Sequence, residues 1–247
     1  AGVFIDVEGA ICAGSAACGA SQGSASSQVR FEWATPSDYS VTGRCYQQGS
    51  QLLNNVDAAC GSGVIIRSTI NQASTGMSYV SFNNAYGFPI YVQSQQAVQY
   101  GTLIFDGSST TVDNLAFSNI NTSNVVALDF AAPTIRDSTF VLGDDGRGYD
   151  AAAVRVYDAG AGILSALTIT GSTLTGNTQA QCGNQGGGRV LIYAENSYIS
   201  MDNLDVKDNA FGVFLKGSSG SLGNSTFDVL CNAIDTNAYK STGDFAH

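Results

Sequence analysis

The stretch Ile199-Ser-Met-Asp-Asn-Leu204-Asp-Val206-Lys-Asp-Asn209, followed at once by Phe211-Gly-Val213-Phe-Leu215, decides the fold. Apolar residues alternate with small or polar ones in both runs, and Asn209 closes the first run. Alternation with a period of two is typical of β-strands, and asparagine tolerates the left-handed backbone of a sharp corner. Residues 197–215 are therefore predicted to form two strands joined by a corner, with Asn119 and Asn177 ending first strands in the same way.

Versions of this phrase recur along the chain and form a degenerate repeat. They begin at Met77, Val112, Ile135, Leu164, Met201 and Leu222. A second alternating run follows each phrase, at Phe88, Val125, Ala153, Arg189, Phe211 and Ala233. One unit cannot cover its own apolar face, but stacked units share a continuous core and pair their backbones with the units above and below. The repeat predicts an all-β parallel solenoid of about six or more turns.

Residues 1–63 differ in texture from residues 64–247, although we expect one structural domain overall. The first region holds a terminal strand at Val3–Val7, a Gly/Ala/Ser-rich segment at 9–27 that we expect to be flexible, and a second strand at Val29–Trp33. This region is predicted to cap the first turn of the solenoid, because an uncovered strand edge invites pairing with another chain.

Composition restricts the partners of the protein. Of the 247 residues only 12% are charged, and the formal net charge is −10. A chain of this charge, with no basic patch, is repelled by phosphate backbones, so we expect no nucleic-acid partner. No apolar run approaches the roughly 18 residues of a spanning helix, so no membrane insertion is expected. The chain starts at Ala1 without an initiator Met, which we interpret as a mature N-terminus left after removal of a signal peptide.

Six cysteines suit an oxidising compartment. Their even number suits disulfide pairing. Their spacings match no zinc site, and His247 is the only histidine. We therefore expect a secreted, extracellular or cell-surface protein with three disulfides. The pairs that we predict, among fifteen connectivities, are Cys12 with Cys18, Cys45 with Cys60, and Cys182 with Cys231.

The phrases at Val112, Leu164 and Met201 resemble the turns of right-handed parallel β-helix proteins, the pectin-lyase-like superfamily. The resemblance covers about Val64 to Ala238 and concerns the fold. It implies a right-handed parallel β-helix, a scaffold that carries polysaccharide lyases, glycoside hydrolases, adhesins and fibre proteins. The Gly-His-Gly, Arg-Ile-Lys and Asn-Thr-Asp elements of the polygalacturonase-like members are absent from this sequence.

One acidic cluster leaves three interpretations open. Asp144, Asp145, Arg147 and Asp150 fall in a Gly-rich insert between predicted strands. The paired carboxylates could act as general acid and base on a glycosidic bond, or they could bind calcium through clustered oxygens. The simplest interpretation is an exposed acidic turn with Arg147 as a local ion-pair partner, so we expect no cofactor and keep calcium as the alternative.

Scattered arginines and the chain ends suggest two classes of function. Arg136, Arg155 and Arg189 fall on or near strands of different turns and could line a groove for an acidic polysaccharide, although single strand arginines are more often solvated. The terminal strand with Val3, Phe4, Ile5 and Val7 could pair with a neighbouring copy by β-augmentation. A head-to-tail contact of this kind does not close and builds a filament. We expect a self-assembling structural or adhesive subunit, with a carbohydrate-active enzyme or carbohydrate-binding protein as the alternative.

Overall fold

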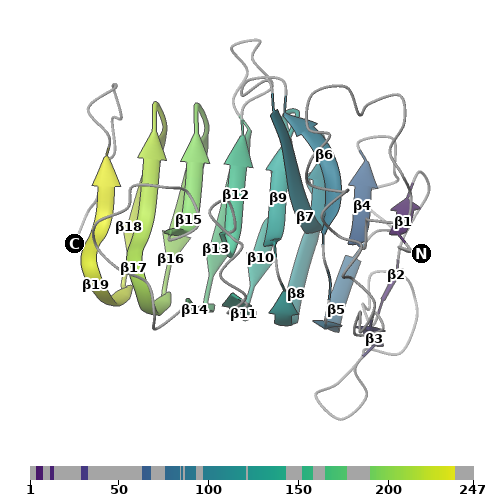
Figure 1. Ribbon diagram of the computed structural model, residues 1–247, viewed down its shortest axis with the longest axis horizontal. Helices are drawn as coiled ribbons and strands as arrows, with labels where there is room; N and C mark the ends of the chain where they lie inside the picture. Colours follow the sequence, from purple (N-terminus) through teal and green to yellow (C-terminus); the bar gives the residue numbers. More distant parts are fainter. Residues whose placement is uncertain are drawn as a thin grey trace, which may run out of the picture.

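The computed structural model describes residues 4–7, 12–13, 29–32, 63–67, 76–83, 85, 87–92, 97–120, 122–142, 152–157, 165–176 and 190–236. In these ranges all regular secondary structure is β-strand, and the nineteen strands belong to one hydrogen-bonded sheet (Figure 1). The strands stack side by side along the long axis of the molecule. The prediction of an all-β chain with parallel pairing is confirmed, and the arrangement fits a β-solenoid.

The strands form three parallel ladders, which the chain visits in the same order on each circuit. The first ladder contains β1 (Phe4–Val7), β4 (Gly63–Arg67), the second half of β7 (Ala97–Asp106), β9 (Ser123–Leu128), β12 (Val154–Tyr157), β15 (Val190–Glu195) and the second halves of β17 (Asp205–Lys216) and β19 (Thr226–Thr236).

The second ladder contains β2 (Cys12–Ala13), the first halves of β5 (Gly76–Asn83) and β8 (Thr111–Ile120), β10 (Thr134–Arg136), β13 (Ala166–Thr170), β16 (Tyr198–Asp202) and β18 (Ser219–Gly223). The third ladder contains β3 (Val29–Glu32), the second halves of β5 and β8, β11 (Thr139–Leu142), β14 (Thr173–Thr175) and the first halves of β17 and β19. Strands β1 to β3 thus extend the same three ladders as the rest of the chain.

Three strand segments per circuit, instead of the predicted two, result from a bend inside each repeated phrase. The backbone angle φ is positive at Tyr79, Asn114, Asp137, Gly171, Asn203 and Asn224, which occupy one column between the second and third ladders. A single left-handed residue turns the chain without adding a loop. The alignment of the repeated phrase at Leu164 is also wrong. It would pair Leu164 with Met201, whereas the observed register pairs Ile169 with Met201.

The corner predicted at Asn209 is found within one residue: β17 leaves the third ladder after Lys207 and enters the first ladder at Phe211, and the residue with positive φ is Asp208. Asn119 directly precedes Ile120, the last residue of β8, and the chain then crosses to β9 of the first ladder. Asn209 is buried at a shift of register within β17, where its side-chain amide donates to the carbonyl of Phe211 at 3.0 Å. Alternation alone does not show which polar residue carries the bend. Asn177 lies outside the described residues.

Serines that follow the left-handed residues form hydrogen bonds with the backbone of the neighbouring circuit. The hydroxyl of Ser138 accepts a hydrogen bond from the Leu115 backbone N–H at 3.1 Å and donates to the Arg136 carbonyl at 2.7 Å. Ser172 repeats both contacts one circuit later, with the Ser138 backbone N–H and the Thr170 carbonyl. These side chains satisfy backbone groups that would otherwise be left without partners at the bend.

The core lies between the three ladders and contains a column of aromatic rings. Phe31, Phe82, Phe117 and Phe140 occupy equivalent positions on four successive rungs of the third ladder, and neighbouring ring centroids lie 5.3, 4.8 and 5.1 Å apart. The rings are nearly parallel, with interplanar angles of 9 to 14°. Parallel in-register strands align identical side chains, so one apolar residue per circuit builds a continuous column.

One segment departs from the parallel pattern. Strand β6 (Phe88–Val92), which the alternation predicts as the second strand of its circuit, pairs antiparallel with the first half of β7. Ile90 and Val92 of this hairpin pack against Ile65, Ile104 and Val126 on the outward face of the first ladder. The hairpin therefore covers part of that outward face.

Candidate functional site

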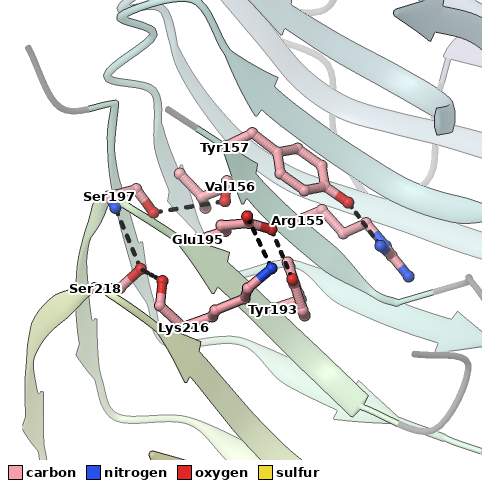
Figure 2. A network of polar contacts seen from close by, with 8 residues as sticks. All are labelled: Arg155, Val156, Tyr157, Tyr193, Glu195, Ser197, Lys216 and Ser218. Carbon is pink, nitrogen blue, oxygen red and sulfur yellow. Dashed lines mark hydrogen bonds and ion pairs between the residues drawn. The ribbon is translucent and has the colours of Figure 1, made fainter. Parts of the chain in front are cut away.

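The outward face of the first ladder carries a buried polar network (Figure 2). Arg155 lies opposite Val126 on one side and opposite Tyr193 on the other. Its guanidinium donates to the Tyr157 hydroxyl at 2.6 Å and to the Gln99 side-chain carbonyl at 3.3 Å. The guanidinium carbon also lies 5.2 Å from the centroid of the Tyr193 ring. A cation at this distance over a ring face is attracted by the negative charge of the π system.

A second part of the network surrounds Glu195. The Tyr193 hydroxyl donates to one carboxylate oxygen at 2.7 Å, and the Lys216 ammonium lies 3.1 Å from the other. The side chain of Glu195 is 6% exposed, whereas that of Lys216 is 47% exposed. Burial raises the pKa of the Tyr193 phenol, and its hydrogen bond to Glu195 raises this pKa further. The phenol therefore stays protonated and acts as a donor.

The network fastens neighbouring circuits to one another. Ser197 links two of them, because its hydroxyl donates to the Val156 carbonyl at 3.5 Å and its backbone N–H donates to the Ser218 hydroxyl at 3.2 Å (Figure 2). Arg155, Tyr193 and Glu195 are each less than a tenth exposed. Substrate in solution can reach only the half-exposed Lys216, so the arrangement suits holding strands in register more than catalysis.

A second polar group lies where β7 and β9 end. Arg67 donates to Asp106 across one rung at 2.8 Å. Burial raises the pKa of Asp129, and the negative charge of Asp106 and a hydrogen bond between the two carboxyl groups raise it further. Two such carboxyl groups can share one proton, which is the behaviour of acid–base pairs in hydrolytic enzymes.

The C-terminal end of the stack leaves part of the core exposed. Among the described residues, β18 pairs only with β16, and β19 pairs only with β17. The inward side chains of Leu222, Phe227, Val229 and Ile234 are only partly buried, and Leu230 is 63% exposed. At the opposite end, β1 pairs with β4, and β2 and β3 pair with β5. Within the described ranges, each end therefore presents a strand edge that could accept further strands.

The residues predicted to form a site are placed as follows. Phe4, Ile5 and Val7 form β1 on their own chain's β4, whereas Val3 lies outside the described residues. The acidic cluster at Asp144, Asp145, Arg147 and Asp150 lies between β11 and β12, also outside them. Cys12 lies in β2, and Cys231 in β19 is disulfide-bonded. The other cysteines, Cys18, Cys45, Cys60 and Cys182, are not among the described residues, so the predicted connectivity stays a prediction.

Arg155 is neither solvated, as single strand arginines are expected to be, nor part of an open groove, because it is 3% exposed and donates to Tyr157 within the network. Arg136 is exposed on β10, and Arg189 lies outside the described residues. The sequence offers one signal for the network that alternation alone does not use. Arg155-Val-Tyr157 and Tyr193-Ala-Glu195 place polar residues at the same two positions of paired strands whose outward face is buried and would ordinarily be apolar.

No family model matches the chain, and no curated protein or solved structure shows significant similarity to it. Within the part of the chain that the structure describes, no helix is long and apolar enough to cross a membrane. The same residues contain no group of three or more His, Cys, Asp or Glu side chains placed to hold a metal ion.

Proposed function

We propose that this protein is a secreted structural or adhesive subunit that assembles head to tail with copies of itself into an extracellular filament or surface layer. In this proposal the chain is a right-handed parallel β-helix of the pectin-lyase-like type. The observation that carries the proposal is the C-terminal end of the stack, where core side chains stay partly exposed beside an edge of β18 and β19. An edge of this kind is a template for strands of another chain.

The two ends of the stack match in two core columns. In the third ladder the inward column begins with Phe31 and ends with Phe227, and in the first ladder the register position of the core residue Val64 runs from Ile5 to Ile234. A second copy that continues both ladders would place its Phe31 over Phe227. This contact would extend the aromatic column and remove apolar surface from water, which favours association.

The same register sets the conditions for assembly. It would place Glu32 of the next copy opposite Asp228, and Asp6 of that copy opposite Asp235. Like charges directly opposite each other on paired strands are destabilising. We therefore expect assembly to strengthen at a pH near the ordinary carboxylate pKa of about 4, and at high ionic strength.

Electron microscopy and sedimentation velocity at pH 4.5 and pH 7.5 test this proposal. We expect filaments of the wild-type protein at the lower pH and dispersed particles of the Phe227→Arg variant. Thr168→Arg is the matched control, because Thr168 is exposed on the second ladder away from both ends. Circular dichroism must show the same fold for all three proteins. Monomers of wild-type protein at high concentration under both conditions would sink the proposal.

A second candidate function follows from Asp106 and Asp129. The raised pKa of Asp129 makes its carboxyl group a candidate proton donor, and in the carbohydrate-active alternative the substrate would be a polysaccharide. Release of reducing ends from extracellular polysaccharides, lost in Asp129→Asn, would support this function. Activity that depends on calcium and disappears in Asp144→Ala would instead favour the acidic cluster of Asp144, Asp145 and Asp150.

A further inference from the structure

Three neutral side chains at the base of the β6–β7 hairpin have buried polar atoms without hydrogen-bond partners. These atoms are the hydroxyl oxygens of Thr102 and Thr122 and both the amide nitrogen and the carbonyl oxygen of the Asn124 side chain. Thr102 and Asn124 are 0% exposed, and Thr122 is 6% exposed. Each unsatisfied buried polar atom lowers the folding equilibrium constant roughly five- to a hundredfold, and native proteins contain few of them.

The three residues lie together on two neighbouring rungs of the first ladder. Register pairs Gly101 with Ser123 and Leu103 with Val125, so Thr102 lies opposite Asn124. The side chains of Leu103 and Val125 enter the core, and alternation along the strands places Thr102 and Asn124 on the outward face. Neighbouring strands are about 4.8 Å apart, a separation that one small molecule bridges with two hydrogen bonds.

Gly87 provides the second observation at this place. A Cβ atom at Gly87 would lie 2.3 Å from the Thr122 hydroxyl oxygen and 3.1 Å from the Gly101 backbone nitrogen. Residue 87 is therefore a glycine at the point where a side chain would block the Thr122 hydroxyl. The position directly precedes β6, whose first residue Phe88 pairs with Gly101.

We infer that Thr102, Thr122 and Asn124 form an internal hydration site, which holds ordered water between β7 and β9 at the base of the hairpin. The three side chains offer hydroxyl and amide donors together with hydroxyl and carbonyl acceptors, which is the mixture that water satisfies. They contribute no carboxylate, so the set does not suit a divalent cation, which prefers charged oxygen ligands. Water at this site connects the first ladder to the point where the antiparallel hairpin leaves it.

The direction in which one substitution changes the folding equilibrium constant distinguishes a hydrated site from a site with unsatisfied atoms. Thr102→Val keeps the shape of the side chain and removes the hydroxyl. If that hydroxyl binds water, the variant loses hydrogen bonding, and we expect its folding equilibrium constant to fall about fivefold. If the hydroxyl is unsatisfied, the same substitution removes a buried penalty and raises the equilibrium constant. Thr122→Val makes the same test on the neighbouring rung.

Thr110→Val is the matched control. Thr110 is 1% exposed, and its hydroxyl lies 2.8 Å from the Ser108 hydroxyl. Thr110→Val therefore measures how much the loss of a formed hydrogen bond lowers the folding equilibrium constant in this protein. Urea unfolding of the three variants gives the equilibrium constants, and a high-resolution crystal structure gives a second readout. We expect density about 3 Å from the Asn124 amide and a threonine hydroxyl. A Thr102→Val protein as stable as wild type or more stable, an empty site, or density at 2.0–2.6 Å as for a cation overturns the inference.

Discussion

Replacing Lys216 by methionine tests whether the buried network holds the first ladder together. The substitution keeps the length of the aliphatic chain and removes the ammonium group 3.1 Å from Glu195. Glu195, at 6% exposure, would then lose its ammonium partner and keep the hydrogen bond from the Tyr193 hydroxyl at 2.7 Å (Figure 2). Removing one partner of a fully buried ion pair costs about 3–5 kcal/mol. Because Lys216 is 47% exposed and water reaches this side of the pair, we expect about 1–3 kcal/mol.

A double-mutant cycle with Glu195→Gln isolates the electrostatic part of this cost. Glutamine still accepts the hydrogen bond from Tyr193 and leaves only the half-exposed Lys216 to be hydrated, so this single change should cost at most about 1 kcal/mol. In the double variant no charge is buried, and its stability should approach that of Glu195→Gln alone. Urea-induced unfolding of the four proteins, followed by intrinsic fluorescence, measures the cycle.

Lys207→Met is the control for the loss of a surface lysine. Lys207 lies 2.7 Å from Asp205, and both side chains are more than a third exposed, so the change should barely alter the free energy of unfolding. Additivity of Lys216→Met and Glu195→Gln within about 0.5 kcal/mol would refute the coupling. The same holds if Lys216→Met proves no more costly than Lys207→Met.

Three further predictions concern the core, one carboxyl pair and the stack end. Phe117→Ala should lower the free energy of unfolding by about 3–5 kcal/mol, because the ring is 1% exposed and stacks on Phe82 and Phe140. A loss of less than about 1 kcal/mol in a urea titration would contradict a stabilising role for the aromatic column. The folded-state pKa of Asp129 is raised, so this carboxyl group contributes stability at low pH that is lost as pH rises through that pKa. Asp129→Asn should therefore raise the melting temperature more at pH 7 than at pH 4, and an equal shift at both contradicts this sign. Asp228→Asn should promote assembly at pH 7.5 in sedimentation velocity, since it removes a like charge from the proposed contact; unchanged sedimentation counts against that register.

The sequence predicts the strands of this protein much better than its corners. Alternation of apolar residues locates the strands, because one face of each second- and third-ladder strand must enter the core. The bends are harder, since the left-handed position is occupied by Tyr79 and Asp137 as well as by asparagine and glycine. A tyrosine in a left-handed conformation is held by the register of its neighbours, which no local pattern reveals.

The polar network is missed for a related reason. The sequence suggests no acidic partner for Lys216, but Glu195 lies directly opposite it on the neighbouring rung, 21 residues earlier in the chain. In a stack of circuits, two residues face each other across a rung when their separation in sequence equals the length of one circuit. This length varies along the chain, so a fixed sequence spacing does not identify such pairs. The antiparallel hairpin of β6 escapes prediction because Phe88-Pro-Ile90-Tyr-Val92 alternates in the same way as a ladder strand does.

The burial of the three ladders is the reason why we proposed a contact at an end of the stack. Strands β9 and β15 of the first ladder are buried at every residue, whereas β13 and β16 of the second ladder alternate between buried and accessible residues. A strand buried on both faces has no side-chain surface left for a partner. The second and third ladders present mainly short hydroxyl and carboxyl side chains, and the network on the first ladder is turned toward protein. The C-terminal edge combines partly exposed core residues with strands that pair on one side among the described residues. Association along the stack axis would satisfy both features at once, which is why we place the proposed contact there.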